Sequence, residues 1–289
     1  MNILITGANG ILGTDLYTIL APKHDITRID IDQADITIPG SISRFLGPTQ
    51  FDLIIHSAAY TDVDGCELNP DKAFFVNGEG TKNIAEYAEY TSTVLMYIST
   101  DFVFDGQKAV PYLETDIPNP INIYGKSKLN GEKYVQEWLS DYYIVRTSWL
   151  FGPSVAKTIT DKKPWKNFVD TIIAKAKPGE TLRVVDDQFG SPTYSLDLAV
   201  AIEQLIETEQ YGIYHISNSG ICSWYQFANE ILKIKGLDKI VKVDSINSEE
   251  LERPTPRPKY TKLDNQKYET ITGNKLRSWR EAVTSYIKE

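Results

Sequence analysis

Short runs of aliphatic and β-branched residues alternate with longer amphipathic segments through the first half of the chain. Five such runs predict buried strands: Asn2–Thr6, Asp25–Asp30, Asp52–His56, Val94–Ser99 and Tyr142–Thr147. The segments between them carry apolar residues three and four apart, which predicts helices over Leu12–Leu20, Ser41–Leu46, Lys72–Tyr90 and Ser127–Leu139. Strands that alternate with helices form βαβ units with right-handed crossovers. The pattern therefore predicts an α/β fold built on a doubly wound parallel sheet.

The pattern changes after Trp149, where Pro and Gly become frequent. Later helices are predicted over Asn167–Lys175, Ser195–Glu207 and Trp224–Lys235, and the run GIYHIS predicts one more strand for the sheet. We therefore predict a sheet domain made from residues 1–150 and 193–218. Residues 151–192 and 219–289 are predicted to form a smaller, C-terminal substrate lobe.

Charge and composition restrict the class of partner. The 289 residues are 42% hydrophobic and carry a formal net charge of −9, which argues against nucleic acid as a partner. An anionic ligand would need local cations, and residues 157–166 and 253–259 are the two basic stretches that offer them. No apolar run approaches the roughly 18 residues that cross a bilayer, and no signal segment precedes the first strand. We expect a cytoplasmic protein that does not bind membranes.

The cysteines and histidines indicate neither a disulfide nor a metal site. Cys66 and Cys222 lie far apart and form no CxxC pair. The three histidines have no metal-ligand spacing. We predict two free thiols and no required metal.

A glycine-rich turn separates the first strand from the first helix. Its sequence is G-A-N-G-I-L-G, with Gly7, Gly10 and Gly13 three apart. Glycine lets the backbone approach a ligand closely, and a helix N-terminus favours a pyrophosphate. We therefore predict that residues 1–150 and 193–218 form a dinucleotide-binding domain. The turn residues predicted to contact the dinucleotide are Gly7, Asn9, Gly10, Ile11, Leu12 and Gly13.

The second predicted strand ends in acidic residues, Asp30 and Asp32, about 20 positions after the glycines. A carboxylate at this place hydrogen-bonds the 2′-hydroxyl of the adenosine ribose. It would repel a 2′-phosphate, and no Arg follows the strand to hold one. We expect NADH to be preferred over NADPH, whose use stays open, and Asp35 and Ile36 to flank the adenine. The alternative is that the two carboxylates only cap a loop.

A second constellation carries proton chemistry. Tyr124 and Lys128 lie four apart, so both face the same side of a helix. A nearby ammonium stabilises a phenolate and lowers the pKa of the phenol, which suits it to proton transfer at neutral pH. Thr100 ends the strand LMYIST, at the sheet edge where ligands bind in open α/β folds. We predict Thr100, Tyr124 and Lys128 as the catalytic residues.

Several longer motifs then add to these short ones. They are ITGANGILG, AAYTDVDGCE, STDFVFDG, YGKSKLNGE, RTSWLFG, VVDDQFGSPT and the late pair Arg257-Pro258. With these motifs the chain resembles the extended short-chain dehydrogenase/reductase family, most closely its dTDP-4-dehydrorhamnose reductase branch. The resemblance runs nearly end to end.

The resemblance implies a Rossmann-like fold and an NAD(P)H-dependent reduction. Hydride would pass to C4 of dTDP-4-dehydro-L-rhamnose and give dTDP-L-rhamnose. Tyr124 would protonate the forming alkoxide, Lys128 would tune Tyr124 and hold the nicotinamide ribose, and Thr100 would orient the carbonyl. The resemblance adds further cofactor contacts at Ser57, Ala58, Ala59, Tyr60, Asn77 and Ser99, beside Tyr124 and Lys128.

Substrate contacts also carry over from the resemblance. They are Thr61, Val63, Thr100, Phe102, Tyr124, Trp149, Asn167 and Arg257. Phe102 departs from the Tyr that is common in the family, which puts any hydrogen bond from that position in doubt. Trp149 has core packing as its alternative. Some members bind magnesium through acidic residues at a dimer interface, but only Asp15 suggests such a ligand here, and a homodimer stays open.

Two other functions compete with the reductase. A sugar-nucleotide epimerase or dehydratase of the same superfamily is the nearer one, but dehydratases often carry Asp-Glu after the strand-end Thr, and here Asp101 is followed by Phe102. A non-catalytic regulatory subunit, like that of methionine adenosyltransferase, is the other. The complete Thr100, Tyr124 and Lys128 set favours catalysis.

Overall fold

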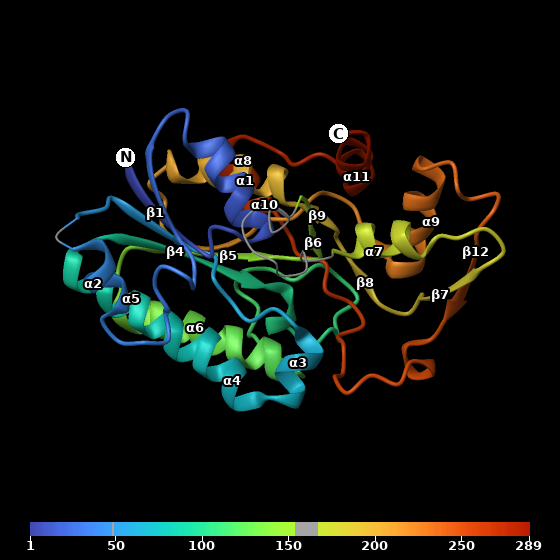
Figure 1. The fold of residues 1–289 in the computed structure, drawn as a ribbon, viewed down its shortest axis with the longest axis horizontal. Coiled ribbons are helices and arrows are strands. Elements are labelled where there is room, and N and C mark those ends of the chain that lie inside the picture. The colour runs from blue at the N-terminus through green and yellow to red at the C-terminus, as the bar shows by residue number, and fades with distance from the viewer. Residues whose placement is uncertain (48, 154–166) are drawn as a thin grey trace.

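A six-stranded parallel sheet forms the centre of the computed structural model, which describes residues 1–47, 49–153 and 167–289 (Figure 1). The strands lie in the order β10-β5-β4-β3-β1-β2, and every neighbouring pair is parallel. Their bounds are β1 Asn2–Thr6, β2 Asp25–Ile29, β3 Leu53–His56, β4 Val94–Thr100, β5 Tyr142–Thr147 and β10 Gly212–His215. The strand order reverses between β1 and β3, which is where such sheets bind ligands. The predicted doubly wound fold is confirmed.

Helices cover both faces of this sheet (Figure 1). One face carries α1 (Ile11–Leu20), α8 (Ser195–Ile206) and α10 (Gln266–Thr272). The other carries α2 (Ser41–Leu46), α5 (Gly80–Thr91) and α6 (Ile123–Trp138).

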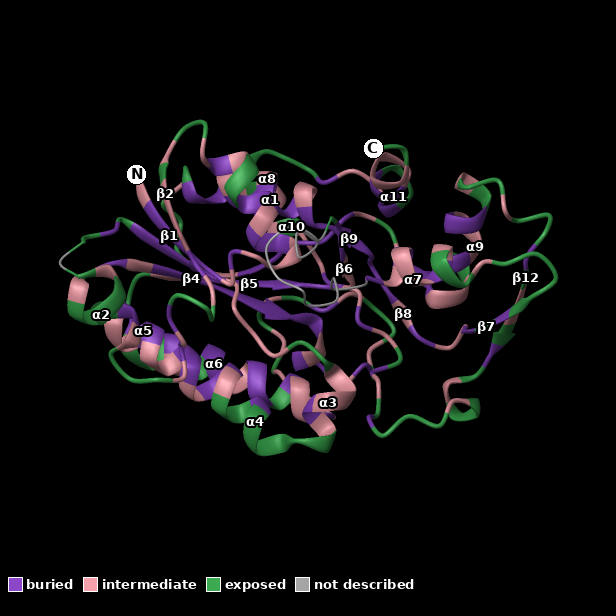
Figure 2. Cartoon of the chain, viewed as in Figure 1, coloured by how far each residue is buried: buried purple, intermediate pink, exposed green. Residues whose placement is uncertain are grey.

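Alternate strand residues point to opposite faces of the sheet, so the strands are buried on both sides (Figure 2). Ile3 and Ile5 of β1 pack in the cluster on the α1 side. Leu4, between them, packs in the cluster on the α5 side. This two-sided burial rigidly holds the carboxyl ends of the strands, where the predicted catalytic residues lie.

The smaller lobe has its own hydrophobic core, which is formed largely by three helices and a strand pair. The helices are α7 (Phe168–Lys175), α9 (Trp224–Ile234) and α11 (Trp279–Lys288), and the parallel pair is β7 (Thr181–Val185) with β12 (Lys242–Ile246). Two short pairs lead from the sheet domain toward this core: β6 (Leu150–Phe151) with β9 (Thr193–Tyr194), and β8 (Phe189–Gly190) with β11 (Cys222–Ser223).

The predicted lobe boundary differs from the packing at the C-terminal end. Tyr268 of α10 and Leu276 belong to the core cluster on the α1 face of the sheet. The Tyr268 hydroxyl donates to Gln204 of α8 at 2.6 Å. Trp279 and Val283 of α11, in contrast, are buried in the lobe core. We therefore place α10 with the sheet domain and α11 with the lobe.

The long helix predicted over residues 72–90 has three parts. They are α4 (Pro70–Phe74), a π-helical turn η1 (Phe75–Glu79) and α5; a short helix α3 (Val63–Leu68) precedes them. The turn lies closely against α6, since a Cβ on Gly78 would come within 2.3 Å of the Asn130 side chain. Such π-turns are frequent at functional sites, and this one contains Asn77.

Three remaining expectations concern membrane-spanning helices, the basic stretches and the thiols. In the described part of the chain, no helix is long and apolar enough to cross a membrane. The basic stretch 157–166 lies outside the described residues, which leave out 154–166. Cys66 and Cys222 are both free and buried, as predicted.

Candidate active site

Thr100 and Tyr124 meet at the carboxyl edge of the sheet. Thr100 is the last residue of β4 and is buried. Tyr124 lies in the first turn of α6, whose N-terminus is capped by Asn122 through a 2.8 Å bond from the Gly125 N–H. Tyr124 shares a hydrogen bond with the Thr100 side chain. The cap therefore starts the helix four residues earlier than predicted and places the phenol beside the strand end.

The pKa of Tyr124 differs from the prediction. Burial raises it well above the ordinary value of a phenol, and the Thr100 hydrogen bond lowers it only in part. The nearby Asp101 carboxyl adds to the rise. Tyr124 is therefore held in its protonated form, as a proton donor requires.

Lys128 lies one turn further along α6 and is buried. Its Nζ donates to the Ile98 carbonyl at 2.7 Å and lies 4.1 Å from the centroid of the Tyr97 ring. Burial lowers the pKa of Lys128 to about 7, and the Glu132 carboxylate opposes that shift. This shift leaves the Lys128 amine half protonated near pH 7.

A buried ion pair between Arg146 and Glu132 lies next to the catalytic residues. Arg146 of β5 contacts both oxygens of Glu132, with Nε–Oε1 at 2.9 Å and Nη2–Oε2 at 2.7 Å. Ser99 donates to the same carboxylate at 2.5 Å. Such a bidentate, desolvated pair is strongly oriented, and it joins β4, β5 and α6 at one point. This pair was not predicted from the sequence, because its partners lie on different elements and each, taken alone, is typical of a surface charge.

Among the described residues, two buried side-chain oxygen atoms at this edge have no hydrogen-bond partner. They are Asp101 Oδ2 and Thr147 Oγ1. Thr147 is paired with Thr100 in the parallel register of β5 and β4, and Asp101 follows Thr100 directly. Buried polar groups are nearly always hydrogen-bonded in native proteins. Their position beside Thr100 fits a polar ligand at the strand ends.

The glycine turn fits a dinucleotide. Gly7 has φ +67°, and a Cβ there would lie 2.6 Å from the Ala58 N. A Cβ on Gly13 would lie 2.4 Å from the Gly7 carbonyl. No side chain caps the N-terminus of α1, and its first turn has no acidic residue. Free amides and a positive dipole end are therefore available to a pyrophosphate, and Ile11 and Leu12 start this helix.

Near the end of β2, Asp30 and Arg28 both contact the glycine turn, and Arg28 was not among the predicted site residues. Asp30 accepts hydrogen bonds from Asn9 N at 2.9 Å and from Ile31 N at 2.8 Å, so it braces the glycine turn. Arg28, two residues earlier, reaches the same turn and donates to the Ala8 carbonyl at 3.0 Å. The prediction considered only cations after the strand. The signal available was the two-residue spacing, since strand residues i and i+2 share a face.

The remaining predicted cofactor contacts lie around the ends of β3 and β4. Asn77 pins the loop after β3: its Oδ1 accepts from Tyr60 N at 2.7 Å, and its Nδ2 donates to Ser127 of α6 at 2.9 Å. Ser57 donates to the Thr6 carbonyl at 2.7 Å. Ala58 lies against Gly7, as described, and Ala59 stands between it and Tyr60.

Asp35 and Ile36 form the loop that follows β2. The Asp35 carboxylate accepts from Thr37 N and from the Thr37 hydroxyl at 2.9 and 2.7 Å. Ile36 is buried, and its carbonyl accepts from Asn83 at 2.8 Å. These bonds fix the loop on α5, on the side of the sheet away from α1.

The predicted substrate contacts Thr61, Val63 and Arg257 gather at α3. The Val63 carbonyl accepts from Thr255 Oγ1 at 3.3 Å, which ties α3 to the late basic stretch. Arg257 donates to Asp64 at 3.0 Å, and desolvation lowers its pKa while Asp64 opposes that shift. Thr61 is exposed in the preceding loop. An anion would therefore share the Arg257 guanidinium with Asp64.

Phe102 and Trp149 both pack on aromatic neighbours. Phe102 meets Tyr124 edge-on, with ring centroids 5.9 Å apart. Trp149 has φ +48° and stacks on Trp224 at 3.5 Å, with planes 3° apart. A Cβ on Gly190 would lie 2.5 Å from the Trp149 ring. One face of the Trp149 indole is thus covered, and Trp224 joins it from the lobe, which the sequence did not indicate.

Asn167 acts as a helix cap. Its Oδ1 accepts from Asp170 N at 2.9 Å at the start of α7. Its Nδ2 donates to the Gly152 carbonyl at 2.8 Å and also lies within hydrogen-bond distance of Tyr286 and Asp170. The amide is buried and makes these contacts within the smaller lobe, and none of them is with Thr100, Tyr124 or Lys128.

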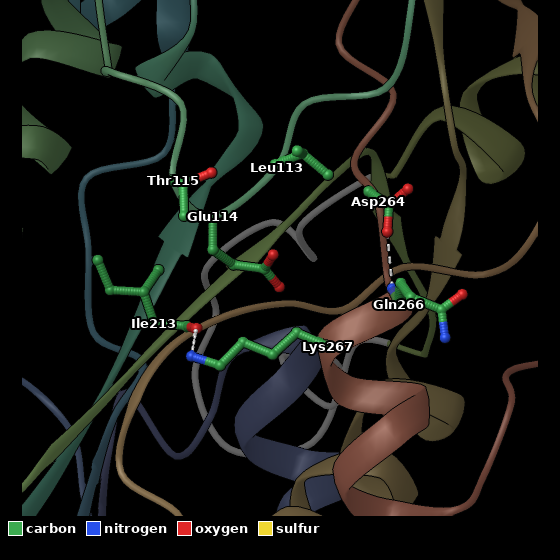
Figure 3. Close-up of a pocket in the computed structure, with 7 residues that line it drawn as sticks. All are labelled: Leu113, Glu114, Thr115, Ile213, Asp264, Gln266 and Lys267. Carbon is green, nitrogen blue, oxygen red and sulfur yellow. Dashed lines mark hydrogen bonds between the residues drawn. The ribbon is translucent and has the colours of Figure 1, made fainter.

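A cavity of about 510 Å³ lies elsewhere, at the β10 edge of the sheet (Figure 3). Lys267 borders it and donates to the Ile213 carbonyl at 2.7 Å, and Glu114 faces the same space. Its lining includes none of the predicted site residues, and the described residues hold no cluster of three His, Cys, Asp or Glu that could bind a metal.

A strand-end Thr, a helical Tyr and Lys, and a glycine turn across one parallel sheet define a short-chain dehydrogenase/reductase. The family model described as RmlD substrate binding domain matches residues 1–289. The chain belongs to this family, the dTDP-4-dehydrorhamnose reductases of the extended short-chain dehydrogenases/reductases. It is accordingly an oxidoreductase that uses a nicotinamide cofactor.

Individual relatives agree over the whole length. The chain is 39% identical to the spore coat polysaccharide biosynthesis protein SpsK of Bacillus subtilis, covering 99% of this chain and 97% of that protein. It is 41% identical to a dTDP-4-dehydrorhamnose reductase of Clostridium acetobutylicum, with a TM-score of 0.92 and 100% and 99% of the two chains covered. For the dTDP-4-dehydrorhamnose reductase of Bacillus anthracis in complex with NADP, the values are 39% identity, TM-score 0.91, and 99% and 98% covered.

Proposed function

We propose that this protein reduces the C4 keto group of dTDP-4-dehydro-L-rhamnose and releases dTDP-L-rhamnose. The observation that carries the proposal is the meeting of Thr100 and Tyr124 at the strand end, with Lys128 one helical turn away. The full-length similarity to proteins named for this reaction supports it.

Each residue of the trio has one task in this reaction. The bound nicotinamide supplies the hydride. Tyr124, held protonated by its burial, donates a proton to the oxygen that becomes the new hydroxyl. Thr100 orients the keto oxygen from the neighbouring strand end. Lys128 binds the nicotinamide ribose hydroxyls. Hydrogen bonds to these hydroxyls would favour the charged ammonium form of Lys128.

The nucleotide part of the substrate lies across α3 and the lobe in this proposal. Arg257, Thr61 and Val63 would contact the diphosphate and sugar, and the indole of Trp149 would border the sugar site. Asn167 caps α7 on that side of the lobe and would also lie near the nucleotide diphosphate. Residues 1–150 and 193–218, extended by α10, would hold the cofactor.

The cofactor proposal is NADH in preference to NADPH, with both accepted. Asp30 supports the preference, because its carboxylate lies at the turn where the adenosine ribose would bind. We also propose that the reaction needs no metal, that the protein acts in the cytoplasm, and that a homodimer is compatible with activity.

The experiment is a direct assay of the purified protein. It is incubated with dTDP-4-dehydro-6-deoxyhexoses and either reduced cofactor, while absorbance of the reduced nicotinamide is followed and the sugar product is identified by NMR. We expect oxidation of the cofactor with formation of dTDP-L-rhamnose, also in the presence of a chelator. Epimerised or dehydrated product without net oxidation would contradict the proposal. Absence of turnover together with tight binding to a larger synthetase would favour a regulatory subunit.

A further inference from the structure

Arg28 extends from β2 to the glycine turn on the α1 side of the sheet. Its Nη2 donates to the Ala8 carbonyl at 3.0 Å and lies 3.4 Å from Asn9 Oδ1. The guanidinium carbon lies 4.7 Å from the centroid of the Tyr17 ring on α1. These contacts fix the cation between the turn and the strand end.

Among the described residues, no carboxylate forms an ion pair with Arg28. In residues 1–47, 49–153 and 167–289, no carboxylate oxygen lies within 4.0 Å of its nitrogens, and its buried Nε–H has no hydrogen-bond partner. A half-buried cation that contacts only neutral acceptors is poorly compensated, because burial weakens its hydration. An anion placed at the turn would supply the missing interaction.

Asp30 locates this cation relative to the proposed cofactor. Asp30 accepts from Asn9 N, and Asn9 Oδ1 faces the Arg28 guanidinium. Asn9 therefore contacts two charged groups. One is the Asp30 carboxylate, which is proposed to receive the ribose 2′-hydroxyl, and the other is the Arg28 guanidinium. A 2′-phosphate bound there would be repelled by the Asp30 carboxylate and attracted by the Arg28 guanidinium.

We propose that Arg28 binds the 2′-phosphate of NADPH and thereby lets the protein accept this cofactor despite Asp30. The inference rests on the dinucleotide site of the proposed function. A guanidinium suits the task, since its planar donors match phosphate oxygens in pairs.

Calorimetric titration with NADP⁺ and NAD⁺ tests this without any sugar substrate. The two ligands differ only in the 2′-phosphate, so their Kd ratio isolates that contact. For Arg28→Met we expect the Kd of NADP⁺ to rise at least about tenfold and that of NAD⁺ to change by less than about threefold. Arg28→Lys keeps the charge but not the paired donors, so it should fall between. Arg183→Met removes an exposed Arg of the lobe, which pairs with Glu250, and should change neither Kd.

Two outcomes would overturn the inference. Equal weakening of both ligands by Arg28→Met would mean that Arg28 only holds the glycine turn in place. An unchanged NADP⁺ affinity would mean that the guanidinium does not reach the phosphate. A protein that binds both cofactors with this selectivity but fails to reduce the sugar would refute the proposed reaction while leaving the inference intact.

Discussion

The hydroxyl of Thr100 donates a hydrogen bond to the carboxylate of Asp101, with 3.1 Å between Oγ1 and Oδ1. Thr100 also accepts from Phe102 N at 3.2 Å. Burial raises the pKa of Asp101 to about 7, although hydrogen bonds from Thr261 and Thr100 oppose the shift. The Asp101 carboxyl, next to the catalytic threonine, therefore changes charge near neutral pH. In its ionised form it can only accept a hydrogen bond from the Thr100 hydroxyl.

Asp101→Asn should change how stability depends on pH. The folded pKa is raised from 3.8 to about 7, so between these values the folded state binds more protons than the unfolded state. The free energy of unfolding of the native protein should therefore fall as pH rises through this range, by up to about 4 kcal/mol. The variant lacks this slope. Urea unfolding of both proteins from pH 4 to 8 should show the variant gaining relative stability.

Asp105→Asn is the matched control for that series. Despite some desolvation, hydrogen bonds from Gln107 N, Tyr112 and Asn119 hold the pKa of Asp105 below its usual value. Its carboxylate therefore stabilises the fold above the ordinary pKa and loses that effect as pH falls, so its removal should cost stability at neutral pH. A pH-independent difference between Asp101→Asn and the native protein would show that Asp101 is already ionised at low pH.

Tyr124→Phe should reduce kcat at least about 100-fold, the usual scale of a general-acid contribution. The ring would keep its edge contact with Phe102, so NADH binding should be nearly unchanged. Steady-state kinetics and a fluorescence titration of the cofactor measure the two effects. Tyr134→Phe removes a hydroxyl on the same helix that donates to Glu79, outside the catalytic residues, and it should keep normal kcat. Near-normal turnover of Tyr124→Phe would assign the proton to another group.

The trio was predictable because its evidence is local. Tyr124 and Lys128 are one turn apart on a helix, and Thr100 ends an apolar run that can only be a central strand. The glycine turn is equally local, since Gly7 and Gly13 are required by close backbone contacts that any sequence of this fold must satisfy.

The parts that escaped prediction depend on contacts between distant segments. The Glu132–Arg146 pair joins a helix to a strand, and the stack of Trp149 on Trp224 joins the sheet domain to the lobe. The π-turn around Asn77 follows from the close approach of Gly78 to α6, which leaves no trace in hydrophobic periodicity. Asn167 carried a motif-based expectation, but its environment makes it a cap.

Lys128→Met should both slow turnover and weaken cofactor binding, because the ammonium is proposed to bind and position the nicotinamide ribose beside Tyr124. Burial lowers the pKa of Lys128 to about 7, so its charge is present below that pH and is lost above it. NAD⁺ binding by the native protein should therefore weaken as pH rises through neutrality, whereas the variant should bind weakly at every pH. Calorimetry from pH 6 to 9 measures this.

Lys126→Met is the control for Lys128, since Lys126 is exposed on the same helix and should leave the pH profile unchanged. If Lys128→Met alters thermal stability alone, with native cofactor affinity and turnover, Lys128 is a packing residue that serves the Ile98 carbonyl and the Tyr97 ring.

Asp30→Asn tests the origin of the proposed NADH preference. The amide oxygen can still accept from Asn9 N, so the glycine turn should keep its shape while one negative charge disappears. A 2′-phosphate carries close to two negative charges, and a unit pair at about 4 Å costs roughly 4 kcal/mol at an effective dielectric near 20, several-fold less when exposed. Since 1.4 kcal/mol is a factor of ten, the NADH-to-NADPH ratio of kcat/KM should fall about tenfold.

Adding Arg28→Met to Asp30→Asn should raise that ratio again, because the attraction is then removed with the repulsion. Asp25→Asn, at the exposed start of the same strand, should leave the ratio unchanged because it is far from the turn. The measurement is steady-state kinetics with both cofactors at low salt, where charge interactions are least screened. If Asp30→Asn leaves the ratio unchanged while Arg28→Met lowers NADPH use, the Asp30 carboxylate serves only as a brace for Asn9 and Ile31, and the cofactor preference is decided by the guanidinium alone.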